Sequence, residues 1–125
     1  MAIIYTYLFN KNKSAIQTNK KTDKELFSLI EKKIKQGNYV FLPHAKKRLS
    51  ERNISELDVI RLLSGEKNYG RKRNKQKDAY ENPSIIDVAQ DWKYCIEGHD
   101  IDGINLRVII TFSDDFMPII TVIRI

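Results

Sequence analysis

The chain has 125 residues, which is enough for one domain of ordinary size and too few for two. Hydrophobic residues make up 42% and charged residues 30%, which argues against a disordered chain, and no apolar run reaches the roughly 18 residues of a membrane-spanning helix. The formal net charge of +6 favours an anionic partner, and the single cysteine, Cys95, excludes an internal disulfide and any cysteine-based zinc cluster. A cytoplasmic protein is expected.

The positive charge is concentrated in the first two thirds of the chain. Residues 1–40 carry 8 basic against 3 acidic residues, residues 41–83 carry 11 against 6, and residues 84–125 carry 3 against 7. Because the strand patterns lie in the acidic last third, we expect helices and loops to supply a basic surface laid over a sheet.

The first 40 residues are predicted to form a strand and a helix that extend a core formed by residues 41–125, all within a single domain. Residues 3–9 are apolar but lack the basic residues and cleavage site of a signal peptide, so we read them as a strand. Thr22 and Glu25 have the spacing of a capping box. Apolar residues then recur at helical spacing up to Gly37, a natural helix end.

Two further helices are predicted after a short apolar segment at residues 39–42. Pro43 suits the first turn of a helix over residues 43–52. Ser55 opens the next helix with a pattern like that of a capping box.

The remaining residues predict a basic segment followed by strands. Five of the seven residues 71–77 are cationic, within a polar stretch from 66 to 83. Helices followed by consecutive antiparallel strands predict an α+β fold, with two to three helices packed on a twisted antiparallel sheet. The last strand is expected to be central, because both its faces are apolar. The predicted strands lie near residues 92–97, 106–112 and 117–125, with turns at 102–103 and 113–115.

The densest group of residues that could carry chemistry lies on the helix predicted at 43–52. His44, Arg48 and Arg52 are four residues apart, so they line one side of a helix at the edge of its apolar stripe. The helix dipole disfavours an imidazolium in the first turn, and a neutral His44 could accept a proton as a general base. Arg48 and Arg52 could hold a phosphate and offset charge in a transition state. This combination suits metal-independent RNA cleavage, in which the ribose 2′-OH attacks the adjacent phosphate.

A structural explanation of the same residues stays open. His44 could bond a backbone carbonyl, and the two arginines could pair with Glu51 or Glu56. His99 is a candidate general acid if its hairpin folds near His44, and otherwise a turn residue.

Other basic and aromatic residues are candidates for RNA contacts. The cationic run offers phosphate contacts without sequence reading, or is a solvated loop. Arg107 interrupts an apolar strand and needs a carboxylate or a substrate phosphate as partner, and Tyr80 could stack on a base or simply pack. No P-loop, dinucleotide fingerprint or HExxH motif is present, so neither a cofactor nor a metal is expected. The predicted RNA-binding residues are Lys47, Arg71, Lys72, Arg73, Lys75, Lys77, Tyr80 and Arg107.

A set of spaced residues carries a resemblance to a known family: His44, Ala45, Arg48, Leu49, Arg52, Ile54, Ser55, Val59, Leu63, Gly98, Gly103, Leu106, Val108, Ile120, Thr121 and Val122. This pattern resembles that of a family of small, mostly uncharacterised bacterial domains grouped with BrnT-like and RelE-like ribonuclease toxins. The resemblance covers about residues 41–125. It implies a compact RelE/barnase-like architecture, RNA as substrate, no metal, and an antitoxin that covers the basic site. The family's suspected functional residues correspond to His44, Arg48 and Arg52.

Three hypotheses follow from the sequence. The leading one is a toxin-type, metal-independent endoribonuclease with His44 as general base. The second is a non-catalytic basic module that binds nucleic acid or an acidic partner protein. The third is an interaction protein whose apolar last strand and N-terminal strand pair with another chain, for instance in a homodimer through edge strands.

Overall fold

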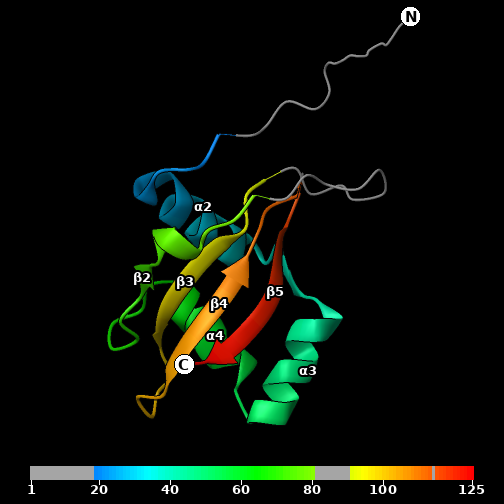
Figure 1. Cartoon of the computed structure of the whole chain (residues 1–125), viewed down its shortest axis with the longest axis vertical. Helices are drawn as coiled ribbons and strands as arrows, with labels where there is room; N and C mark the ends of the chain where they lie inside the picture. Colours follow the sequence, from blue (N-terminus) through cyan, green and yellow to red (C-terminus); the bar gives the residue numbers. More distant parts are fainter. Residues whose placement is uncertain (1–18, 81–90, 114) are drawn as a thin grey trace, which may run out of the picture.

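The computed structural model describes residues 19–80, 91–113 and 115–125, which form an α+β fold (Figure 1). Helices α2 and α4 lie behind a twisted sheet, and α3 lies beside β5 (Figure 1). The elements in chain order are α2 (Asp23–Gln36), β1 (Tyr39–Phe41), α3 (Pro43–Arg52), α4 (Glu56–Leu63), β2 (Lys72–Arg73), the 3₁₀ helix η1 (Lys75–Lys77), β3 (Tyr94–His99), β4 (Asn105–Ile110) and β5 (Met117–Arg124).

The sheet has five strands in the order β1-β5-β4-β3-β2. The three predicted strands do form consecutive antiparallel neighbours, and β5 is interior as its apolar faces indicated. However, β1 runs parallel to β5, with Tyr39 opposite Met117, so the sheet is mixed and not purely antiparallel. A strand of three residues is too short to show the alternation by which strands are predicted.

The interior position of β5 bears on the third hypothesis. β4 pairs with one edge of β5, and β1 pairs with the other edge at residues 117–119, so strand addition from another chain could reach only the remaining part of that edge. The edges of the described sheet are β1 and β2, of three and two residues. The strand predicted at residues 3–9 lies outside the described residues.

The helix boundaries follow local signals that the sequence displays. The capping box of α2 is confirmed: Thr22 Oγ1 accepts from the Glu25 N–H at 3.2 Å, and Glu25 Oε1 accepts from the Thr22 N–H at 2.9 Å. Gly37 ends the helix in a left-handed conformation. Pro43 occupies the first turn of α3, and the Ser55 hydroxyl caps α4.

The connection between β3 and β4 is organised by a buried carboxylate. Asp100 Oδ1 accepts hydrogen bonds of 2.9 Å from the N–H groups of Asp102 and Ile104. The turn therefore spans residues 100–104, and His99 pairs with Asn105 at its base.

The core lies between the sheet and helices α2 and α4. Ile96, Val108 and Val122 are fully buried, in register with one another on the sheet face that these helices cover. Leu26 and Ile30 of α2 belong to the same core cluster. No helix in the described part of the chain has the length and apolar character needed to span a membrane.

Gly98 sets how closely α4 and the following loop approach β3. A Cβ atom at this position would lie 2.5 Å from the backbone oxygen of Tyr69 and 2.9 Å from the side chain of Leu62. The same Tyr69 oxygen accepts a hydrogen bond of 2.9 Å from the His99 N–H. This close approach fixes the end of β3, where His99 lies.

Candidate nucleic-acid interface

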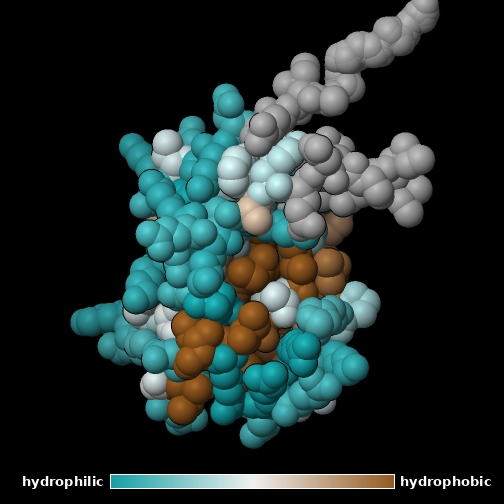
Figure 2. Space-filling model, in the orientation of Figure 1, coloured by the Kyte–Doolittle hydropathy of each residue, from teal (hydrophilic) through white to brown (hydrophobic). Residues whose placement is uncertain are grey.

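The sheet face opposite α2 and α4 carries the candidate residues Lys72 and Arg107. Alternation places Glu97, Arg107 and Ile123 in one register row on this face. Cys95, Ile109 and Thr121 form the neighbouring row. Among the residues that the structure describes, no helix lies over the front of the sheet (Figure 1). Figure 2 shows apolar side chains gathered in the middle of this view with hydrophilic ones around them.

Helix α3 carries the residues predicted to be catalytic at the β5 side of the sheet. His44 and Arg52 are exposed and form no hydrogen bond or ion pair within the described ranges. Arg48 Nη1 lies 3.2 Å from Glu51 Oε1, and Lys47 Nζ lies 4.0 Å from the same carboxylate. These surface pairs contribute little to stability, so a phosphate can compete with Glu51 for both cations.

Arg71 is held against α2 and α4. Its Nη1 donates to Glu31 Oε2 at 3.0 Å and to the backbone oxygen of Leu63 at 2.9 Å. Its guanidinium carbon also lies 4.1 Å from the ring centre of Phe27. These contacts anchor the start of the basic segment, residues 71–77, to the helices.

Arg73 is turned inward, and its side chain is only 2% exposed. Its Nε donates to Asp78 Oδ2 at 3.0 Å, and its Nη1 donates to Asp23 Oδ1 at 2.8 Å. The guanidinium lies over the ring of Tyr94, and the other oxygen of the buried Asp78 accepts from the Cys95 N–H. Arg73 therefore ties the basic segment to α2 and β3.

The lysines of the basic segment are the cations that it presents outward. Lys72, Lys75 and Lys77 are all exposed. Lys75 Nζ lies 3.5 Å from Asp23, an exposed pair that a phosphate can replace. The segment, predicted as a polar or solvated loop, instead contains β2 and η1, so the inward arginines fix where the lysines stand.

Tyr80 and Arg107 both have partners within the protein. The ring of Tyr80 packs at 5.6 Å from that of Trp92. Arg107 Nε donates to Glu97 Oε2 at 2.8 Å, and Asn74 Nδ2 donates to the same oxygen at 3.1 Å. Burial alone would raise the pKa of Glu97, but these two hydrogen bonds hold it below its ordinary value.

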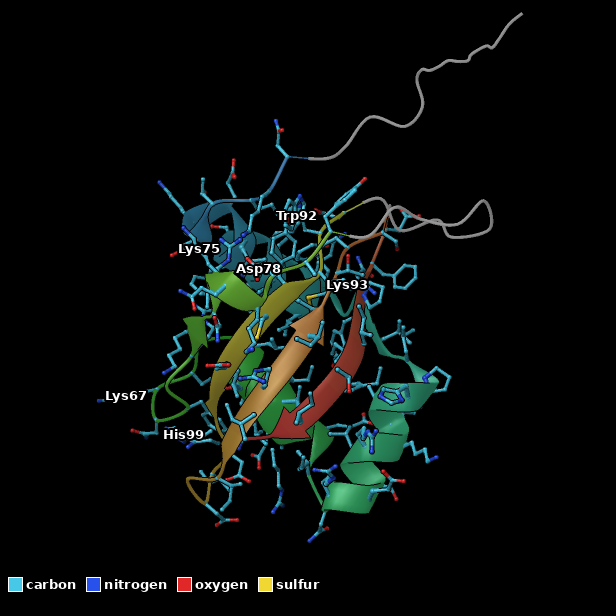
Figure 3. All side chains as sticks on the ribbon, in the orientation of Figure 1. Lys67, Lys75, Asp78, Trp92, Lys93 and His99 are labelled. Carbon is cyan, nitrogen blue, oxygen red and sulfur yellow. The ribbon has the colours of Figure 1, made fainter. Side chains whose placement is uncertain are left out.

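His99 lies at the end of β3 away from Lys75 and Asp78 (Figure 3). It does not meet His44, because β4 and β5 separate β3 from α3. His99 therefore cannot act as the general acid in a cleavage reaction for which His44 is the general base. His99 instead borders a small pocket of about 210 Å³ that sequence reasoning did not identify, lined by Gly70, Lys72, Glu97, Gly98, His99, Asn105 and Ile125.

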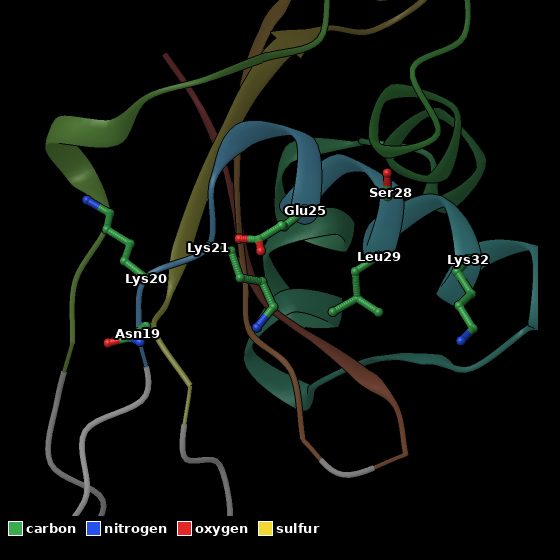
Figure 4. A pocket seen from close by; sticks show the side chains of 7 residues that line it. All are labelled: Asn19, Lys20, Lys21, Glu25, Ser28, Leu29 and Lys32. Atoms are coloured by element: carbon green, nitrogen blue, oxygen red, sulfur yellow. The ribbon is translucent and has the colours of Figure 1, made fainter.

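A second hollow, of about 500 Å³ and more open, lies beside the start of α2 (Figure 4). Two of its lysines already have partners: Lys21 pairs with Asp91, and Lys20 lies 3.5 Å from Asp78 and over the ring of Trp92. Its lining residues are Asn19, Lys20, Lys21, Glu25, Ser28, Leu29 and Lys32.

Comparison with known proteins gives a family and no named activity. No curated protein and no solved structure matches the chain significantly. One family model matches residues 41–124, from the last residue of β1 to the end of β5, and so includes α3, the basic segment and every residue of the His99 pocket except Ile125. The chain therefore belongs to the family described as "Domain of unknown function (DUF4258)".

Proposed function

We propose that the protein is a toxin-type endoribonuclease that cleaves single-stranded RNA without a metal. His44 takes the proton from the ribose 2′-OH, a bond forms between O2′ and the neighbouring phosphorus, and the bond from phosphorus to O5′ breaks. Arg48 and Arg52 bind the phosphate and stabilise the charge that develops on it. Solvent, which reaches this side of α3, supplies the proton to O5′.

The observation that carries the proposal is the availability of these three side chains. His44 and Arg52 are exposed and unengaged within the described part of the chain, and Arg48 has only a surface pair with Glu51. They stand four residues apart on one helix, at the margin of a sheet face that no helix of the described ranges covers (Figure 1). The exposed lysines of the basic segment add phosphate contacts elsewhere on the molecule.

A cleavage assay tests the proposal directly. Purified protein is incubated with mixed cellular RNA in EDTA, and the ends of the products are mapped. Fragments with 2′,3′-cyclic phosphate ends are expected, and His44→Ala should lower the rate by about 100-fold or more, the effect of losing a general base. Lys46→Ala, an exposed change two residues away on the same helix, is the matched control and should cleave at the parental rate.

The arginines are tested by a change that preserves charge. Arg52→Lys keeps the cation but loses the planar pair of donors, so cleavage should fall while RNA binding persists. A His44→Ala protein that cuts RNA as fast as the parent would exclude His44 as the base.

A second candidate function is a non-catalytic module that binds nucleic acid or an acidic partner, such as an antitoxin. The exposed lysines on a segment anchored by Arg71 and Arg73 favour it, because a fixed row of cations binds a phosphate backbone without any chemistry. It predicts a gel shift that weakens with salt and intact RNA after long incubation.

A further inference from the structure

The pocket at the end of β3 and β4 has a histidine whose ring orientation is fixed by the backbone. His99 Nδ1 lies 3.0 Å from the carbonyl oxygen of Asp100. A carbonyl oxygen only accepts hydrogen bonds, so Nδ1 carries a hydrogen and Nε2 is the nitrogen left for a ligand.

Gly70 provides the space in which this ring sits. A Cβ atom on Gly70 would lie 3.2 Å from both Cδ2 and Nε2 of His99, and Gly70 itself has a positive φ of 62°. The Nε2 edge of the ring is therefore next to the loop before β2, and both residues line the pocket.

The pocket has a net positive charge because the charge of its carboxylate, Glu97, is balanced by Arg107. Glu97 lines the pocket, but its Oε2 accepts from Arg107 and Asn74 at 2.8 and 3.1 Å. Lys72 stands opposite Glu97 across the β2–β3 pair. Its charge helps to lower the pKa of Glu97, but it forms no direct ion pair among the described residues. One lysine charge is thus left for a ligand, next to a histidine and the Asn105 amide.

We propose that this pocket binds a phosphate group, with Lys72 Nζ as the charged donor, the Asn105 side-chain amide as a second donor and His99 Nε2 as a further hydrogen-bond partner. The ligand is a phosphate of the RNA strand, and this identification rests on the proposed function. β3 lies two strand spacings, about 10 Å, from β5, and α3 lies beside β5. A phosphate in the pocket therefore lies several nucleotides away from the bond cleaved at His44. The pocket is a binding subsite that holds the strand across the sheet.

Inorganic phosphate is the first probe, because it tests the pocket independently of cleavage. Phosphate is titrated into the protein while the NMR signals of His99, Gly70 and Asn105 are followed. Saturable shifts are expected in the parent. Lys72→Met and His99→Gln should each weaken binding about tenfold, the loss expected for one charge-assisted hydrogen bond.

A matched control separates the pocket from general surface charge. Lys67→Met removes an exposed cation in the turn before Gly70 that does not line the pocket, and should leave phosphate affinity unchanged. Unshifted His99 signals in the parent, or equal binding by Lys72→Met and the parent, would overturn the proposal. The melting temperature of each variant confirms that it is folded.

A short single-stranded ribo-oligonucleotide is the second probe. It should displace phosphate and move the same signals, with lower affinity in Lys72→Met. Phosphate binding that the oligonucleotide does not displace would overturn RNA as the ligand. Oligonucleotide binding at the pocket in a protein that cuts no RNA would support this inference and defeat the proposed catalysis.

Discussion

Replacing Gly98 with alanine tests how tightly β3 is packed against the loop after α4. The new Cβ would lie 2.5 Å from the Tyr69 oxygen and 2.9 Å from Leu62, contacts that cannot persist without movement. Overpacking of this kind costs about 1–3 kcal/mol, and displacing Tyr69 also weakens its 2.9 Å bond from the His99 N–H, worth about 1 kcal/mol. The greater strand preference of alanine returns up to about 1 kcal/mol.

These contributions sum to a loss of about 1–4 kcal/mol in the free energy of unfolding, with a central value of about 2.5 kcal/mol. In a domain of this size such a loss lowers the melting temperature by about 10 °C, measurable by urea and thermal denaturation. Gly103→Ala is the control: nothing lies within 4 Å of its Cβ, and only its positive φ of 83° should cost about 1 kcal/mol. A Gly98→Ala protein as stable as Gly103→Ala would refute the packing argument.

Four further predictions concern buried and exposed charges. Arg73→Met leaves the fully buried Asp78 carboxylate with Lys20 as its cationic partner, 3.5 Å away, and should cost about 3 kcal/mol in urea unfolding; a loss under about 1 kcal/mol would contradict the anchoring role. Lys77→Gln should leave unfolding unchanged and reduce the slope of log RNA affinity against log salt by about 1, whereas an unaltered slope would remove Lys77 from the interface. Burial raises the pKa of the Cys95 thiol to about 11, so thiol reagents at neutral pH should modify the folded protein about 100-fold more slowly than the unfolded one; equal rates would show an accessible thiolate. Because the pKa of Glu97 is lower in the folded chain, its ionised form stabilises the protein fully above about pH 4.5, and this contribution is lost as the pH falls through the lower folded value. Unfolding of Glu97→Gln should therefore depend less on pH in the acid range than that of the parent, and identical acid profiles would disprove the assignment.

The helices could be predicted because their signals are local. The Thr22–Glu25 capping box, Pro43 and Ser55 each act within one turn of the chain, so neighbouring residues in the sequence contain all the information needed. The interior position of β5 could also be predicted from the sequence, because a strand buried on both faces has apolar residues along its whole length.

The polar network of the candidate site could not be predicted, because it depends on a register that the turn signal does not specify. A two-residue turn at Asp102-Gly103 would place Glu97 opposite Val108. The turn organised by Asp100 shifts the register by one residue and places Glu97 opposite Arg107 instead. A shift of one residue moves every side chain to the other face, so only the structure brings this ion pair together.

The basic segment shows a different limit of sequence reasoning. From composition alone, all the cations of residues 71–77 are expected to be available to a ligand. In the structure, Arg71 and Arg73 bind acidic groups of the protein itself, and the lysines between and after them face outward. Arg73 also binds Asp78, which is nearby in the sequence, but the partners Glu31 and Asp23 lie on α2, far away in the sequence, and no local pattern links them to the arginines.

The parallel pairing of β1 with β5 also determines when, during synthesis, α3 can pack against the sheet. Leu42, at the start of α3, donates its N–H to Ile119 of β5, and the buried side of the helix packs on that strand. On the ribosome α3 emerges well before β5, so its polar side has no sheet beside it until every intervening strand has been made. A nascent chain that ends before β5 therefore lacks the assembled α3 surface, and any activity that depends on this surface begins only after β5 has been translated.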